Sequence, residues 1–273
     1  MPSPEASVAC LFVPGNRPER FGKAIATGAL SILDLEDAVA AADKDRARAC
    51  LADAPEAVRQ AVVRINGRNT DWFDGDLALL GDLMPAAVML PKAESADDIA
   101  ALRASLPDRS IIALVETAKG IASARAIAAA DGVVRLAFGT VDFCADMRMR
   151  DEGGTLDAFR SELALASRLA DIASPVDGVC ADFSDDNALR AHARRAATFG
   201  FGGVLCIHPR QVSVVEQAFA PSADDLARAR RIVDAAGSAS SGVINVDGVM
   251  VDRPVVELAR QLIALHERLS GAV

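Results

Sequence analysis

Short apolar runs that recur along most of the chain restrict its fold more than any other feature of the sequence. There are eight runs, and each has the length and the β-branched content of a buried strand. They occupy residues 8–13, 30–35, 61–65, 86–90, 111–115, 134–138, 176–181 and 203–207. The segments between them are rich in Ala and Leu and show helical periodicity. The pattern therefore predicts eight strand–helix units in succession.

Eight alternating units predict an α/β fold, specifically a closed (β/α)8 TIM barrel. An open, doubly wound sheet is the alternative. Such sheets often carry a Gly-x-Gly-x-x-Gly motif after the first strand, whereas Pro14 and Gly15 follow the first run here. The long interval between the sixth and seventh runs predicts an insertion at about residues 146–155.

The chain continues beyond the eighth unit. A capping-box pattern at Ser222 and a proline at Pro254 predict two more helices, and a Gly- and Ser-rich link at 237–242 separates them. We therefore predict a barrel domain at 1–221 and a C-terminal helical extension at 222–273. Two interpretations of this extension stay open: a fixed helical cap, or a mobile lid attached by the link.

Charge and composition exclude several classes of partner. The net charge is −9, with 29 basic and 38 acidic side chains and no polybasic run, which argues against nucleic acid and anionic membranes. No apolar run reaches the roughly 18 residues that span a bilayer. The N-terminus lacks the pattern of a signal peptide, and the five scattered cysteines are typical of a reducing compartment. We expect a soluble, cytoplasmic protein.

Acidic residues follow several of the predicted strands. Glu116 comes directly after the run 111–115, and Asp142 follows the run 134–138. In a barrel these strand ends are neighbours at the face that carries the active site. An oxygen-rich cluster without a cysteine pair predicts Mg²⁺, or Mn²⁺, rather than zinc. The alternative is that these acids cap helices or pair with Arg and Lys.

Two basic residues, Arg64 and Lys92, lie at the same predicted face. A charge that follows an apolar run needs a partner. For Arg64 this partner is either an internal carboxylate, Asp34 or Glu36, or the carboxylate of a substrate, which a guanidinium binds in a bidentate manner.

The motifs at these strand ends resemble the citrate lyase β-subunit-like proteins, within the aldolase superfamily that also holds malyl-CoA and citramalyl-CoA lyases. Eight motifs occur in order over essentially the whole chain. They are FVPGNRPERF from Phe12, LDLEDAV from Leu33, VRIN from Val63, MLPKAES from Met89, ALVETA from Ala113, AFGTVD from Ala137, CIHP from Cys206 and MVDRP from Met250.

The resemblance implies a role for each matched residue of the predicted site. Glu116 and Asp142 would bind Mg²⁺. Arg64 would hold the carboxylate of a keto-acid, aided by the backbone at Gly139 and Thr140. We assign Asp37 and Lys92, from the same motifs, to substrate binding as well.

Other matched residues concern coenzyme A and assembly. Arg17 and Lys23 match positions that contact the coenzyme A arm in such enzymes. Asp252 matches a lid aspartate that reaches the site of a neighbouring subunit, which implies a homo-oligomer, either a trimer or a hexamer. One position departs from the family pattern, because Val141 stands where a Glu usually precedes the metal-binding Asp.

The resemblance implies a Mg²⁺-dependent carbon–carbon lyase. It would cleave a 3-hydroxyacyl-CoA thioester (citramalyl-, malyl- or citryl-CoA) into acetyl-CoA and a keto-acid by retro-Claisen chemistry, with Arg64 and Asp252 as catalytic residues. Three alternatives stay open. They are a divalent-metal aldolase acting on free keto-acids, a lyase subunit acting on an acyl-carrier-protein thioester, and a silent binding protein, for which Val141 is the only support.

Overall fold

The computed structural model describes residues 2–150, 154–237 and 243–271. The chain divides into two compact units, Met1–Ala218 and Phe219–Val273. Residues 238–242 of the predicted link (237–242) and residues 151–153 of the predicted insertion lie outside the described residues.

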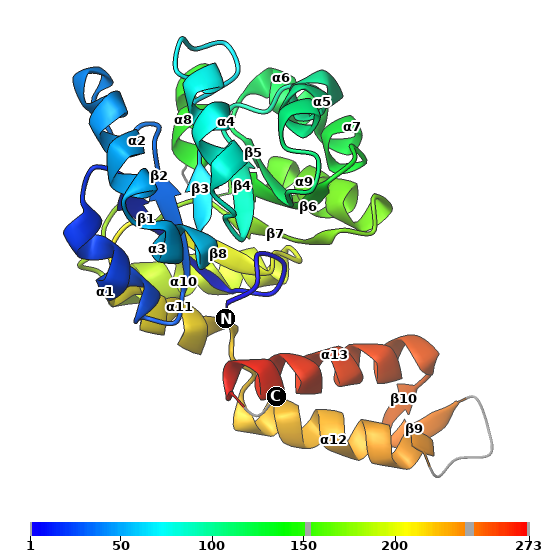
Figure 1. Ribbon diagram of the computed structural model, residues 1–273. Coiled ribbons are helices and arrows are strands. Elements are labelled where there is room, and N and C mark those ends of the chain that lie inside the picture. Colours follow the sequence, from blue (N-terminus) through cyan, green and yellow to red (C-terminus); the bar gives the residue numbers. More distant parts are fainter. Residues whose placement is uncertain (1, 151–153, 238–242, 272–273) are drawn as a thin grey trace. The chain divides into compact units, whose positions relative to one another are not determined.

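The first unit is a closed barrel of eight parallel strands, so the predicted fold is confirmed (Figure 1). Strand order follows the chain, and β8 closes the barrel on β1 through pairs such as Leu205 with Cys10. The strands are β1 (Ala9–Pro14), β2 (Leu30–Asp34), β3 (Val62–Arg64), β4 (Ala87–Leu90), β5 (Ile111–Val115), β6 (Val133–Phe138), β7 (Ala173–Asp177) and β8 (Gly203–Cys206).

Helices follow each strand and lie outside the barrel (Figure 1). Ser95 caps the start of α5, since its side chain accepts a hydrogen bond from the backbone N–H of Asp98. The helical segments are η1 (Pro18–Arg20), α1 (Phe21–Ile25), η2 (Ala41–Asp43), α2 (Lys44–Ala52), α3 (Pro55–Arg59), α4 (Phe73–Asp82), α5 (Ala96–Ser105), α6 (Ala118–Ala122), α7 (Ala124–Ala128), α8 (Thr140–Asp146), α9 (Asp157–Leu169), α10 (Asp186–Thr198) and α11 (Arg210–Phe219).

Apolar side chains from all eight strands fill the barrel interior, as the uniformly buried runs require. The main exception is Arg135 on β6, which is 1% exposed. Its guanidinium donates hydrogen bonds to the backbone carbonyl oxygens of Ser174 (2.7 Å) and Ser7 (2.8 Å), so this buried charge is satisfied.

The seventh strand differs from the prediction. It spans Ala173–Asp177, not residues 176–181, and it therefore ends at Asp177 rather than before Asp182. The apolar pattern misplaced it because Val179 is apolar for a different reason: it lies past the strand and lines a cavity. Asp182 is an exposed loop residue.

The second unit is a pair of packed helices with a small hairpin. Helix α12 (Ala223–Gly237) packs against α13 (Arg253–Leu269), and strands β9 (Ile244–Val246) and β10 (Val249–Val251) pair antiparallel. Both predicted helices are present, and the predicted boundary at residue 221 falls between α11 and α12. The role of this unit as cap or lid stays a prediction.

Among the described residues, no helix is long and apolar enough to cross a membrane.

Candidate active site

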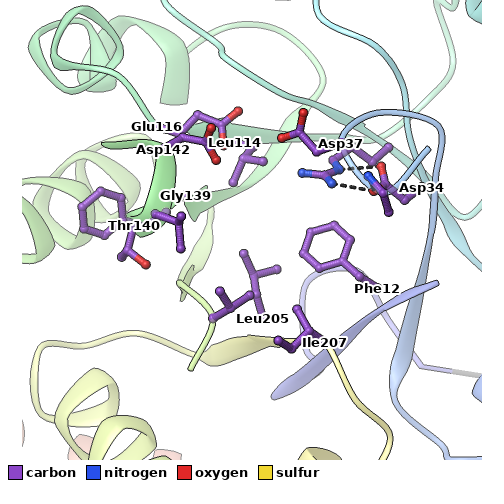
Figure 2. A pocket seen from close by; sticks show the side chains of 15 residues that line it. Phe12, Asp34, Asp37, Leu114, Glu116, Gly139, Thr140, Asp142, Leu205 and Ile207 are labelled. Atoms are coloured by element: carbon purple, nitrogen blue, oxygen red, sulfur yellow. Dashed lines mark hydrogen bonds and ion pairs between the residues drawn. The ribbon is translucent and has the colours of Figure 1, made fainter. Parts of the chain in front are cut away.

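The ends of several barrel strands surround a cavity of about 210 Å³ (Figure 2). The strand-end location is the one at which barrel enzymes hold their active sites. The lining consists of Phe12, Asp34, Asp37, Ala38, Arg64, Leu114, Glu116, Phe138, Gly139, Thr140, Val141, Asp142, Val179, Leu205 and Ile207. Most of the predicted site residues therefore converge on one cavity.

The two predicted metal ligands come from adjacent strands. Glu116 directly follows β5, Asp142 lies in the first turn of α8 after β6, and Figure 2 shows both on the same side of the cavity. Gly139, between β6 and α8, makes this arrangement possible. A Cβ atom at Gly139 would lie 2.3 Å from Oε2 of Glu116, closer than any real contact. Glycine is thus required here for space, and the space it leaves holds the Glu116 carboxylate.

Glu116 is a buried carboxyl group whose environment disfavours its negative charge. Burial raises its pKa to about 8, and the charges of Glu36 and Asp142 add to the rise, whereas Lys92 opposes it. The backbone N–H of Lys92 donates to Oε1 of Glu116 over 2.8 Å. A buried acid beside other acids is the type of site that a divalent cation stabilises.

Lys92 lies at the edge of this acidic group. Its backbone has a positive φ of 49°, an uncommon conformation for a residue with a side chain. The conformation lets one residue contact two acids: the backbone N–H binds Glu116, while Nζ donates to Oε1 of Glu36. Nζ also lies 3.8 Å from Oδ2 of Asp37.

Arg64 contacts both of the internal carboxylates that the sequence offered as its partners, Asp34 and Glu36. Its Nε and Nη2 donate to the two carboxylate oxygens of Asp34 over 2.7 and 2.6 Å, and Nη1 lies 3.0 Å from Oε2 of Glu36 (Figure 2). Burial lowers the pKa of Arg64, but the hydrogen bonds and the charge of Asp34 outweigh this, so the pKa is raised overall. A guanidinium has five N–H donors, so the pairing with Asp34 leaves N–H groups on the terminal nitrogens for a ligand.

Behind Arg64, a second network holds the loops after β2 and β3. The Nζ atom of Lys44 donates to the carbonyl oxygens of Leu35 (2.7 Å) and Glu36 (2.8 Å) and to Oδ1 of Asn66 (2.6 Å). Asn66 in turn donates through its side chain to Asp76 over 2.7 Å. Lys44 was not predicted to belong to the site, because a basic side chain in a helical segment usually indicates an exposed position.

On the opposite side, Gly178 approaches Thr140. A Cβ at Gly178 would lie 2.1 Å from Oγ1 of Thr140, so this loop packs directly on the start of α8. The carbonyl oxygen of Gly178 is 2.9 Å from Nε2 of His192. His192 of α10 is thus partly buried and fixes the loop after β7, although a histidine in a helical segment without metal-ligand spacing predicts a surface position. Asp177, fully buried, accepts a 2.8 Å hydrogen bond from Arg160.

Three predicted site residues lie elsewhere. Arg17 and Lys23 are exposed, on the segment after β1, and do not line the cavity. Asp252 belongs to the second unit, where its side chain accepts a hydrogen bond from the N–H of Val255 and caps α13. Their predicted roles with coenzyme A and as a lid acid stay predictions.

The donor set fits Mg²⁺. In the part of the chain that the structure describes, no three His, Cys, Asp or Glu side chains converge to enclose a metal. Mg²⁺ needs no such enclosure, because it is usually bound by one or two carboxylates and completed by water and substrate. Glu116 and Asp142, with the clearance that Gly139 provides, match this requirement.

Comparison with known proteins gives consistent results. A family model described as HpcH/HpaI aldolase/citrate lyase matches residues 9–209. The chain is 42% identical over 264 residues to a citrate lyase subunit beta-like protein of Mycobacterium tuberculosis, covering 93% of each protein. It is 34% identical to a (3S)-malyl-CoA thioesterase of Cereibacter sphaeroides, covering 96% of this chain and 95% of that protein.

A solved structure is similar over nearly the full length. The crystal structure of CitE from Mycobacterium tuberculosis in complex with magnesium, acetoacetate and coenzyme A superposes with a TM-score of 0.85 at 39% identity. The match covers 96% of this chain and 98% of that one.

Proposed function

The chain belongs to the HpcH/HpaI aldolase/citrate lyase family, and on this premise we propose that it is a Mg²⁺-dependent carbon–carbon lyase. Its substrate is a 3-hydroxyacyl thioester of coenzyme A, and its products are acetyl-CoA and a keto-acid. The observation that carries the proposal is the convergence of Glu116, Asp142 and Arg64 on one cavity at the barrel's strand ends. Relatives that bind magnesium, acetoacetate and coenzyme A support it.

Glu116 and Asp142 would hold the metal ion. When bound, Mg²⁺ supplies a Lewis acid that polarises oxygens of the substrate and stabilises developing negative charge. The raised pKa of Glu116 supports this assignment, because the ion would offset the repulsion among the acids and keep the carboxylate ionised.

Arg64 would orient the substrate. Its guanidinium is fixed by the bidentate pair with Asp34, so the remaining N–H groups meet a substrate carboxylate from a rigid position. Such positioning aligns the breaking bond with the thioester and lowers the entropic part of the barrier. The backbone at Gly139 and Thr140 closes the other side of the cavity.

The bond changes balance without an oxidant or reductant. The substrate hydroxyl loses its proton and becomes the keto group, while the electron pair of the carbon–carbon bond passes to the enolate of acetyl-CoA. One proton then returns to the α-carbon. We propose Asp252 of a neighbouring subunit as the donor of this proton. This role requires a homo-oligomer, for which we propose a trimer or a hexamer.

Thioester hydrolysis is a second candidate, because one of the relatives is named a (3S)-malyl-CoA thioesterase. Hydrolysis and cleavage give different products from the same substrate: free coenzyme A with an intact hydroxy-acid, or acetyl-CoA with a keto-acid. Product analysis therefore separates the two reactions.

The test is incubation of the purified protein with citramalyl-CoA, malyl-CoA and citryl-CoA, with Mg²⁺ or with EDTA, and chromatographic analysis of the thioesters. We expect acetyl-CoA from at least one substrate, only with the metal. Release of free coenzyme A alone would favour the thioesterase. No reaction with any of the three would contradict the proposal and favour a carrier-protein thioester or a free keto-acid as substrate.

A further inference from the structure

The cavity has two chemically different walls. The ends of β2, β3, β5 and β6 carry the polar wall, whose charged groups are Asp34, Asp37, Arg64, Glu116 and Asp142; Leu114 of β5 and Phe138 of β6 also line the cavity there. The other wall is apolar and is formed by Val179, Leu205 and Ile207 from the ends of β7 and β8 and the segments after them. Phe12 of β1 lies where the two walls meet, since its ring centroid is 4.5 Å from Cζ of Arg64. In Figure 2, Leu205 and Ile207 lie on one side and the carboxylates on the other.

The balance of charge in the lining disfavours a second anionic group on the ligand. Four carboxylates line the cavity, and Arg64 is the one basic side chain among the described lining residues. Arg64 is already paired with Asp34 and Glu36. The nearby amino group of Lys92 is held by Glu36. A metal ion and Arg64 together suffice for one substrate carboxylate, and a second one would lie unpaired against the apolar wall.

Val141 adds an apolar side chain to the cavity lining beside Asp142, one of the two proposed metal ligands. It lies at the start of α8 and is 60% exposed. Its two methyl groups lie at a position where the resemblance implies a glutamate in related proteins. A ligand with an alkyl group would remove part of this apolar surface from water.

We propose that the keto-acid half of the substrate has a single carboxylate and a short alkyl group, and that Val141 and Ile207 help to select it. The released acid is then a 2-oxo monocarboxylic acid, such as pyruvate or 2-oxobutyrate, rather than a 2-oxo dicarboxylic acid. This inference rests on the proposed function, since it concerns the specificity of the same cavity.

The test is a direct binding measurement that does not depend on turnover. Calorimetry in the presence of Mg²⁺ would compare pyruvate, 2-oxobutyrate and oxaloacetate. We expect the monocarboxylates to bind at least about tenfold more tightly than oxaloacetate, since an unpaired carboxylate against an apolar wall is costly. Oxaloacetate binding as tight as pyruvate binding would overturn the specificity inference but leave the proposed function intact. Absence of binding for all three acids would overturn both.

Two variants test whether the apolar wall causes the preference for monocarboxylic acids. Ile207→Lys adds a cation to the apolar wall at a side chain that is 44% exposed, so the fold should tolerate it. It should shift the preference toward oxaloacetate by about tenfold or more. Met84→Lys is the matched control, since Met84 is also exposed in the barrel unit but does not line the cavity. An equal shift in both variants, or none in Ile207→Lys with an unchanged circular dichroism spectrum, would contradict the role of this wall.

Discussion

The polar and apolar walls of the cavity are held in place in different ways. On the polar wall, Asp34 and Arg64 each have several hydrogen-bonding or ionic partners. Asp34, for example, binds Arg64 twice and also accepts from the backbone N–H groups of Glu36 (2.9 Å) and Ala38 (3.0 Å). On the apolar wall, side chains such as Leu205 are placed by the strands that carry them.

Because the two walls are held differently, they should control different properties of the site, namely its chemistry and stability on one side and its choice of substrate on the other. Hydrogen-bond networks fix position and charge closely, so substitutions on the polar wall should change the chemistry and the stability. Apolar contacts are less directional and tolerate changes of shape, so substitutions on the apolar wall should change the choice of substrate.

Removal of Glu116, the proposed buried metal ligand, should have the largest effect. We expect Glu116→Ala to reduce Mg²⁺-dependent turnover by about 10³-fold, because the metal contributes several kcal/mol of charge stabilisation to the transition state. Glu162→Ala is the control, since Glu162 pairs with Arg125 outside the cavity. Steady-state kinetics at saturating Mg²⁺ provide the measurement. Wild-type turnover in Glu116→Ala would exclude a role for Glu116 as a ligand.

Loss of the internal partner of Arg64 should mainly affect stability. Asp34→Ala leaves a buried guanidinium without its bidentate partner and should lower the free energy of unfolding by about 3 kcal/mol. Urea denaturation measures the change. Asp131→Ala removes a surface partner of Arg103 and should cost less than about 1 kcal/mol. Similar losses in the two variants would show that the polar wall is not held by this network.

A methyl group at Gly139 should disturb the carboxylate that lies against it. Gly139→Ala would place Cβ 2.3 Å from Oε2 of Glu116, so the carboxylate must move. We expect Mg²⁺ affinity to fall by about 10- to 100-fold, as for other changes around a metal ligand. Gly81→Ala is the matched control, because a Cβ at Gly81 in α4 meets nothing within 4 Å. Unchanged metal affinity in Gly139→Ala would place the metal elsewhere.

The last prediction concerns the dependence of stability on pH and isolates the contribution of Glu116 on the polar wall. Because the pKa of Glu116 is raised to about 8 in the folded protein, Glu116 binds its proton more tightly when folded than when unfolded. Its contribution to stability is therefore complete below its unfolded pKa of about 4.3 and is lost as the pH rises through about 8. In metal-free buffer, Glu116→Gln should lack this component of the decline in Tm between pH 5 and 8. Parallel pH profiles of wild type and variant would contradict the raised pKa.

The sequence predicted most of the barrel because its strands are buried on both faces. The run 111–115 gave β5 with both ends correct, since polar residues flank it. The run 176–181 gave a misplaced β7, because residues that line the cavity are apolar as strand residues are. A single sequence does not distinguish a side chain that faces the core from one that faces a ligand.

The candidate site was predictable where strand ends carry charge, as for Arg64, Glu116 and Asp142. It was not predictable where contacts come from distant parts of the chain. Lys44 hydrogen-bonds to Asn66 only because the closed barrel brings the two residues together. Likewise, the need for glycine at Gly139 and Gly178 comes from side chains of other segments that lie against them, and no local sequence pattern indicates it. The sequence around Asp252 likewise carries no local signal for the cavity that this residue would approach.

We propose that Glu116 and Asp142 together form one divalent-cation site. Calorimetric titration with Mg²⁺, supported by electron paramagnetic resonance with Mn²⁺, tests it directly on the wild type and on Glu116→Gln, Asp142→Asn and Asp146→Asn. Asp146 lies on the same helix as Asp142 but outside the cavity. We expect a single ion per chain in the wild type and in Asp146→Asn, and at least a tenfold weaker affinity in the other two variants. Equal affinity in all four proteins would contradict it.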